Sequence, residues 1–270
     1  MVTTKALPNL VDMPEIIAPA VKDGHTAIVL IQNGIGIEAP YEHRFPNNPI
    51  ISVVSYLDAR HDNRNRDLII HGTTVAIALN LYHGYSDNHP SSTAGSSSMA
   101  AAVGQQALDT LVEAFNRGKV ECVIVKSIQA CRWQKLIWNG AFNPMSVLAG
   151  GRNTAEMLAC PQFYQLVLDV MNEIYTAGCT VTGQSLDGGY YGGGPNIILK
   201  RTMDAPVPVY PSMLGDFKSG RPMEHQVILK NTIDIAKRHG VEMPRLETIY
   251  GHLLLLESSY LKNNERTSPS

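Results

Sequence analysis

The first half of the chain alternates short apolar runs with polar turns, which is the pattern of a sheet. Runs of this kind lie at residues 27–31, 50–56, 68–71, 75–79 and 120–125. Short continuous apolar runs are typical of strands covered on both faces, as in parallel sheets. Residues 2–6 read like the end of one more strand. We therefore expect an α/β domain with a mostly parallel sheet.

Two helices are expected among these strands. One begins at Asp12 as N-cap and ends near Gly24, and the other covers residues 99–115 with apolar side chains at helical spacing. Residues 86–98, which precede the second helix, are rich in Ser, Asn and Gly. This composition predicts a mobile surface connection.

Beyond residue 126 the pattern becomes helical. Apolar side chains keep helical spacing over residues 163–174 up to Gly178, and again over 246–254 after Pro244. We therefore divide the chain into domains at 1–126 and 127–270, the second all-α.

A glycine-rich segment at residues 188–195 interrupts the helical half. Glycines at this density resemble a phosphate cradle, but no Lys-Ser/Thr pair follows them. A flexible loop is the favoured interpretation.

The stretch from Trp133 to Pro144 carries a polar row in an apolar helix. Side chains four residues apart overlay on one helical face, so Lys135, Asn139 and Asn143 would line up. Two interpretations are open. The lysine could reach solvent while the asparagines bond locally, or it could donate a proton beside two amides that orient a small polar substrate. Pro144 biases the residue before it away from helical geometry, so the row is expected to bend at Asn143.

Composition excludes several classes of partner. The chain has 270 residues, 44% of them hydrophobic, and a formal charge of −2 without a basic stripe, so we expect neither nucleic acid nor an anionic membrane as partner. No apolar run reaches the roughly 18 residues of a transmembrane helix, and no signal-peptide pattern opens the sequence. The expected location is cytoplasmic.

Cysteine and histidine usage gives no support for a metal site. The four cysteines form no C-x-x-C pair, and the nine histidines form no H-E-x-x-H motif. We expect reduced cysteines and no bound metal.

Three ordered motifs together resemble the ketopantoate reductase family. They are a sheet-forming start with K-A and Q-N-G-x-G, then W-x-K-L-x-x-N-x-x-x-N-P, then S-M-L-x-D-x-x-x-G-R-x-x-E at residues 212–224. Alone, the last segment reads as a turn leading into a helix near Glu224. The resemblance covers most of residues 2–257.

The resemblance implies a fold and an activity. The fold would be a partial Rossmann-type domain followed by an all-α domain of the 6-phosphogluconate dehydrogenase C-terminal type. The activity would be NADPH-dependent reduction of 2-dehydropantoate, or a related 2-keto acid, in the cleft between the domains, as a step of pantothenate biosynthesis. A small-molecule substrate is the expected partner, and a homodimer the candidate assembly.

The resemblance also assigns roles to residues. Lys135 would be the proton donor. Substrate would contact Asn33, Asn139, Asn143, Asn153 and Ser212, and the cofactor would contact Lys5, Asn33, Ala59 and Glu224. The chemistry fits, because hydride addition to a ketone leaves negative charge on oxygen, which a partly desolvated ammonium can stabilise and protonate.

The chain also departs from the family pattern. The family's G-x-G-x-x-G after a first strand, which holds a pyrophosphate at a helix N-terminus, does not occur here, and His225-Gln226 and Leu229-Lys230 replace the family's usual acid and Asn-Gly pair. We therefore expect either a piece of a longer enzyme or a degenerate relative that kept the substrate half. In the second case the helical half would serve as a non-catalytic dimerisation or interaction module.

Overall fold

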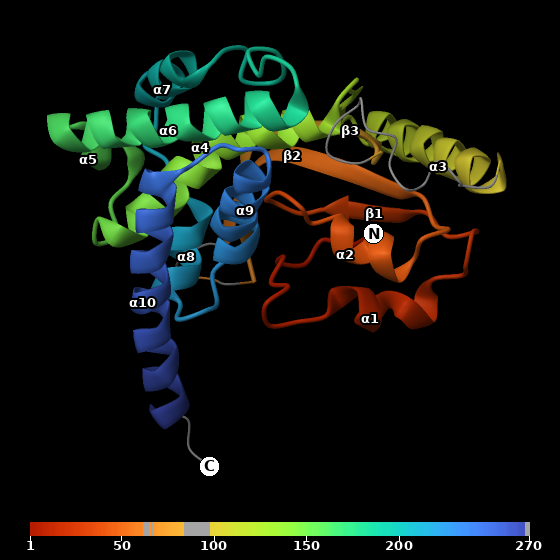
Figure 1. Ribbon diagram of the computed structural model, residues 1–270, viewed down its shortest axis with the longest axis horizontal. Coiled ribbons are helices and arrows are strands. Elements are labelled where there is room, and N and C mark those ends of the chain that lie inside the picture. The colour runs from red at the N-terminus through yellow and green to blue at the C-terminus, as the bar shows by residue number, and fades with distance from the viewer. Residues whose placement is uncertain (62–64, 66, 84–97, 268–270) are drawn as a thin grey trace. The chain divides into compact units, whose positions relative to one another are not determined.

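The computed structural model describes residues 1–61, 65, 67–83 and 98–267, and the chain forms two compact units (Figure 1). Unit 1 comprises Met1–Thr4, Met13–Gln32 and Ile37–Ile128, and unit 2 comprises Lys5–Asp12, Asn33–Gly36 and Gln129–Ser270. The connection predicted at 86–98 lies outside the described residues except for Ser98. Two short segments from early in the sequence therefore belong to the same unit as the C-terminal half.

Unit 1 is built on a four-stranded sheet with the order β1-β2-β3-β4. Its strands are β1 (Ile28–Ile31), β2 (Ile50–His61), β3 (Ile69–Leu81) and β4 (Glu121–Ile124). The β1–β2 and β3–β4 pairs are parallel and the β2–β3 pair is antiparallel. Val2 adds a parallel bridge to Leu30. The predicted mostly parallel sheet is confirmed.

The central pair of strands is longer than the sequence predicted. The two strands predicted at residues 68–71 and 75–79 correspond to the single strand β3, which begins at Ile69, and β2 extends past residue 56 to His61. The pairing shifts register between Leu57 and Ala59. Residues 72–74 do not end β3, because pairing with the antiparallel neighbour β2 holds the strand on both sides of them, at His71 and at Val75.

The core of unit 1 lies between the sheet and helix α3 (Ser98–Arg117). Leu108 of α3 packs with buried side chains of the central strands, namely Val29, Ile51, Val53, Ile77 and Leu79. The unit also contains the short helices α1 (Met13–Ile17), η1 (Ala18–Ala20) and α2 (Ala39–Arg44). The helix predicted from Asp12 to Gly24 is shortened because Pro19 has no N–H to continue it and disfavours α geometry at the residue before it.

Unit 2 is all-helical, as predicted. Its helices are α4 (Ile128–Leu148), α5 (Thr154–Leu158), α6 (Pro161–Thr182), α7 (Pro195–Met203), α8 (Ser212–Lys218), the π-helical turn η3 (Gln226–Lys230), α9 (Asn231–Arg238) and α10 (Pro244–Thr267). Helix α6 contacts α5, α7, α9 and α10 and is the centre of the unit. Residues 212–218, predicted as a turn, form α8, and the segment after the glycine-rich loop forms α7.

Glycines set the close approach of α4 and α6, which lie side by side in Figure 1. A Cβ at Gly140 would lie 2.7 Å from Ile174, and a Cβ at Gly178 would lie 2.9 Å from Trp133 and 2.6 Å from Leu186. Gly178 therefore serves packing and does not end α6. The helix continues to Gly183, which has the left-handed φ of 66° typical of a residue following a helix.

Helix α4 also differs from its prediction. It runs without interruption through Asn143 and Pro144 to Leu148, so the polar row stays on one helix to its end. Within the described part of the chain, no helix has the length and apolar character to cross a membrane.

The packing between α4 and α6 can be tested with a pair of glycine substitutions. Gly178→Ala should lower the free energy of unfolding by about 1–3 kcal/mol, because the added methyl overlaps Trp133 and Leu186. Gly251→Ala in α10 is the control: its methyl would meet no described atom within 4 Å, and it should raise stability by about 0.5–1 kcal/mol through helix propensity. Urea unfolding followed by tryptophan fluorescence measures both, and a stabilised Gly178→Ala variant would contradict the packing.

Candidate functional site

One face of α4 carries a row of buried polar side chains. Arg132 is 3% exposed, Asn139 8% and Asn143 1%, with Lys135 partly buried between them. Positions 132, 135, 139 and 143 fall on one side of a helix of 3.6 residues per turn. The apolar positions of α4 bury Trp133, Ile137, Phe142 and Met145 on its other sides. This amphipathic arrangement separates the polar row from the main apolar contacts of the same helix.

Lys135 is held against Asn33. Its Nζ donates a hydrogen bond of 2.8 Å to Asn33 Oδ1. The pKa of Lys135 lies at about 8, below its ordinary value of 10.5. Burial is the largest cause, the Arg132 guanidinium also lowers this pKa, and the Glu224 carboxylate acts in the opposite direction. An ammonium with a pKa near 8 is charged at neutral pH yet gives up its proton readily, which suits a general acid.

Contacts with Val227 and Asn231 hold the turn that carries Asn33 in place. Gly34 has φ 94°, and a Cβ there would lie 2.6 Å from Val227, so only glycine fits. The Ile35 N–H donates to the Val227 carbonyl at 2.8 Å, and Asn231 Nδ2 donates to the Ile35 carbonyl at 2.8 Å. These contacts keep the Asn33 side chain within reach of Lys135.

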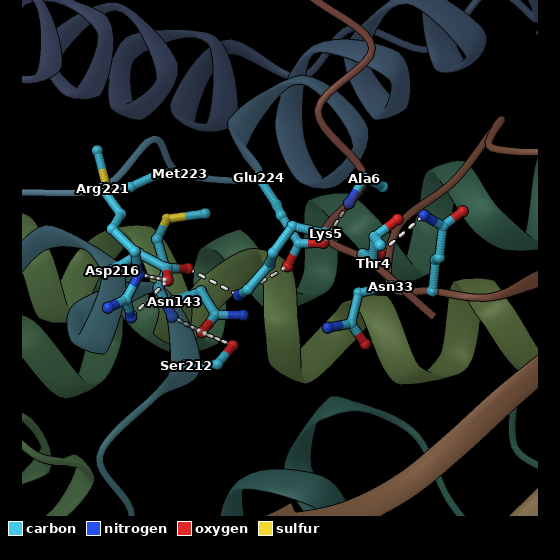
Figure 2. Close-up of polar contacts among 12 residues, drawn as sticks. Thr4, Lys5, Ala6, Asn33, Asn143, Ser212, Asp216, Arg221, Met223 and Glu224 are labelled. Carbon is cyan, nitrogen blue, oxygen red and sulfur yellow. Dashed lines mark hydrogen bonds and ion pairs between the residues drawn. The ribbon is translucent and has the colours of Figure 1, made fainter. Parts of the chain in front are cut away.

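A second group of charges surrounds Lys5 (Figure 2). Lys5 Nζ lies 2.7 Å from Asp216 Oδ2 and 3.2 Å from Glu224 Oε2, and both carboxylates are buried. Glu224 Oε1 accepts the Ala6 N–H at 2.9 Å, and Arg221 donates to Asp216 Oδ1 through Nε at 3.2 Å and Nη2 at 3.1 Å.

The electrostatic role of Lys5 differs from that of Lys135. Burial lowers the pKa of Lys5, but the Glu224 and Asp216 carboxylates outweigh it and raise the pKa above its ordinary value. Lys5 therefore stays charged at neutral pH and holds the two carboxylates in place.

Asn143 connects the row on α4 to helix α8. Its Oδ1 accepts the Met213 N–H at 3.3 Å and the Ser212 hydroxyl at 3.4 Å (Figure 2). Its Nδ2 is buried and has no hydrogen-bond partner in the described part of the chain. A buried donor without a partner is costly. Such a donor fits a ligand oxygen.

The other predicted residues are placed differently. Asn153 caps α5: its Oδ1 accepts the Glu156 N–H at 3.0 Å, and its Nδ2 lies 3.4 Å from the Tyr210 hydroxyl. Ala59 belongs to unit 1, where it is exposed in β2 and pairs with His71. Unit 2 by itself brings together Lys5, Asn33, Lys135, Asn139, Asn143, Ser212 and Glu224.

The structure adds residues for which no role was predicted from the sequence. Asp216 and Arg132 are two of them, and a helical reading of residues 128–148 would have placed Arg132 one turn before Lys135. Glu257 of α10 is the third: its Oε1 accepts the Met223 N–H at 2.8 Å and its Oε2 lies 2.7 Å from His225 Nε2. Glu257 thereby fixes the chain on both sides of Glu224, a contact across more than 30 residues that no local pattern signals.

Among the described residues, no group of three or more His, Cys, Asp or Glu side chains is arranged to hold a metal ion. The donors available to a ligand are instead ammonium, guanidinium and amide groups. These suit an organic anion more than a cation.

An α/β sheet unit and a helical unit with this lysine and amide face define the fold class of a group of oxidoreductases. Within it, the chain belongs to the ketopantoate reductase family: the family model described as "Ketopantoate reductase PanE/ApbA" matches residues 1–78, and "Ketopantoate reductase PanE/ApbA C terminal" matches residues 127–257.

Named relatives agree with this assignment. The structure of 2-dehydropantoate 2-reductase from Methylococcus capsulatus is 30% identical, with a TM-score of 0.75 over 95% of this chain and 73% of that one. The 2-dehydropantoate 2-reductase of Nostoc is 26% identical over 91% of this chain and 70% of its own length. The meiotically up-regulated gene 72 protein of Schizosaccharomyces pombe is 29% identical over 92% of this chain, which spans only 42% of that protein's length.

The lowered pKa of Lys135 predicts how stability depends on pH. Below about pH 8 both the folded and unfolded chains hold the proton, and the folded state carries the full cost of the buried charge. Between about pH 8 and pH 10.5 only the unfolded chain holds this proton, so the free energy of unfolding increases as the pH rises. Lys135→Met should therefore be more stable than the parent by about 1–3 kcal/mol at pH 7, with a smaller advantage at pH 10. Urea unfolding at the two pH values measures this, and an advantage that does not shrink would contradict it.

Proposed function

We propose that the chain is an NADPH-dependent reductase of 2-dehydropantoate or a related 2-keto acid, a reaction that would serve pantothenate biosynthesis. The observation that carries the proposal is the α4 face, where a lysine with a pKa of about 8 lies on the same row as a buried asparagine that has an open donor. Membership of the ketopantoate reductase family supports the reaction class.

Lys135 is the proton donor in this proposal. Reduction of a ketone to an alcohol builds negative charge on the carbonyl oxygen, and an ammonium next to that oxygen stabilises the charge and then neutralises it by giving up a proton. Asn33 Oδ1 accepts one of the three N–H bonds of Lys135 and so orients the others. Partial burial of Lys135 keeps water from weakening its interaction with the substrate oxygen.

The amides bind the remaining polar groups of the substrate. Asn143 Nδ2 donates to an oxygen of the keto acid, and its Oδ1 keeps the Ser212 hydroxyl close at 3.4 Å. Asn139, buried one turn before Asn143, supplies a second amide. Asn153 joins them through its Nδ2 amide group, which has a second N–H besides the one directed at the Tyr210 hydroxyl. The charged side chains of this set are four basic ones, Arg132, Lys135, Lys5 and Arg221, and two carboxylates, Asp216 and Glu224. This excess of positive charge favours an anionic substrate.

The residues fit the nicotinamide and ribose end of a dinucleotide. Glu224 is a buried carboxylate that accepts hydrogen bonds from Lys5 and from the Ala6 N–H, and Lys5 and Asn33 are polar groups of the same unit. NADPH, when bound, supplies the hydride that reduces the keto carbon. We assign Ala59 to the cofactor as well, residues 1–126 to a partial dinucleotide-binding domain, and residues 127–270 to the substrate domain.

The proposed function also includes a cellular compartment and an assembly state. All four cysteines are free thiols, which agrees with a reducing compartment such as the cytoplasm. The substrate is a free small molecule, and the assembly we propose is a homodimer.

The test is direct. The purified chain should bind NADPH by calorimetry and oxidise it when 2-dehydropantoate is added, as followed by absorbance. Lys135→Ala should lower kcat by about 10²–10⁴-fold, the usual contribution of a general acid, while changing NADPH affinity little. Absence of NADPH binding would reject the enzyme and favour a non-catalytic interaction module. A panel of 2-keto acids decides between 2-dehydropantoate and its relatives.

The pH profile gives a second expectation. The reductive reaction needs the protonated form of Lys135, so kcat/KM should be level at neutral pH and fall about tenfold per pH unit above roughly 8. A profile that stays level to pH 10 would rule out Lys135 as the acid.

Asn143 allows a test of substrate binding. Asn143→Asp replaces the open donor by a carboxylate that repels an anionic substrate, and it should raise KM for the keto acid more than Asn143→Ala does. The expected order of KM is parent, Ala, Asp, with at least about tenfold between parent and Asp. Equal KM values for the three proteins would show that the substrate does not contact this amide.

A further inference from the structure

Arg132 is a buried cation with a specific contact. It lies on α4 one turn before Lys135, is 3% exposed, and donates from Nη1 to the Gly34 carbonyl at 3.2 Å. Lys135 donates to the side chain of Asn33, the residue before Gly34, at 2.8 Å. Two successive cations of one helical face therefore hold two successive residues of one turn.

We propose that Arg132 is a positioning residue for the reduction: its guanidinium fixes the Gly34 backbone so that Asn33 meets Lys135, and its charge makes the site selective for keto substrates that carry an anionic group. This inference rests on the proposed function.

The positioning role of Arg132 follows from the geometry of the turn at residues 33–36. The turn at residues 33–36 is bonded on one side by Val227 and Asn231, through Ile35. Arg132 bonds its other end at Gly34. A guanidinium is planar and can donate to a carbonyl while its other N–H groups bond elsewhere. Arg132 therefore adds an anchor on the Gly34 backbone to the contacts that already hold Ile35 and the Asn33 side chain.

The selectivity for anionic substrates follows from the electrostatics of two neighbouring cations. Removing a guanidinium from water is unfavourable by several kcal/mol, and placing it near a second buried cation adds repulsion. The charged groups that act on Lys135 are Arg132 on its own helix and Glu224 from the segment before η3, and Arg132 lowers the pKa of Lys135 while Glu224 raises it. An anion bound beside both cations relieves this repulsion, whereas a neutral ketone does not.

Three substitutions separate the hydrogen bond from the charge. Arg132→Gln removes the charge and keeps an amide donor, Arg132→Lys keeps the charge and loses the planar fork, and Arg132→Met removes both. Arg117→Gln is the matched control, because it removes one positive charge from an exposed position of unit 1.

The first measurement is the titration of Lys135 in the full chain by NMR of 13C,15N-labelled lysine, with Lys135→Met used to identify the signal. The midpoint near pH 8 should rise by about half a unit to one unit in Arg132→Gln and Arg132→Met, because a nearby positive charge has gone, and should stay within about 0.3 unit in Arg132→Lys and in the control. An unchanged midpoint in Arg132→Gln, with circular dichroism showing an intact fold, would overturn the electrostatic part.

The second measurement compares substrates. The ratio of kcat/KM for a 2-keto acid to that for its neutral methyl ester should fall at least about fivefold in Arg132→Gln and Arg132→Met and much less in Arg132→Lys. Arg132→Lys and Arg132→Met should both lower kcat, since both lose the fork that fixes Gly34. An unchanged ratio in Arg132→Gln would overturn the proposed role of Arg132 in substrate selectivity. An unchanged kcat in both Arg132→Lys and Arg132→Met would overturn its proposed role in positioning Gly34.

The outcomes distinguish this inference from the proposed function. If the chain reduces no keto acid, the proposed function fails, and the lysine titration still reports whether Arg132 acts on Lys135. If the chain is active and the titration midpoint does not respond to Arg132, only the inference about Arg132 fails.

Discussion

The burial of positive charge on one face of α4 is the constraint on which the rest of unit 2 depends. A helix that buries Arg132 and Lys135 must be held firmly on its other faces, because water would otherwise hydrate both cations and the site would open. The contact with α6 provides this support: Trp133 is fully buried, and Gly140 and Gly178 allow the two helices to approach closely. Apolar packing therefore sets the direction in which the polar row points.

The two lysines of the site show how environment separates similar groups. Lys5 faces two buried carboxylates and keeps its proton, whereas Lys135 faces an amide and a neighbouring guanidinium and holds its proton loosely. The same ammonium group thus serves as a structural cation in one place and as a candidate acid in the other. Burial alone would lower both pKa values, so the neighbouring charges decide the difference.

Much of this arrangement could be predicted from the sequence, since helical spacing placed Lys135, Asn139 and Asn143 on one face and apolar runs located the strands. The errors came where tertiary packing overrides a local signal. Gly178 resembled a helix end but is a packing contact, and residues 68–79 resembled two strands because the antiparallel partner that joins them is not visible locally. Contacts such as Glu257 with His225 join residues 32 apart, and no short-range pattern encodes them.

Pro144 illustrates how a local rule can fail for a physical reason. A proline inside a helix lacks an N–H and its ring crowds the carbonyl four residues earlier, which here belongs to Gly140. Glycine has no side chain to add to that crowding, and the Ser146 hydroxyl bonds the Asn143 carbonyl at 2.8 Å. The helix continues past Pro144, and Asn143 remains in the row with its Oδ1 directed to Met213 and Ser212. Gly140 thus allows close packing on α6 without adding a side chain next to the proline ring.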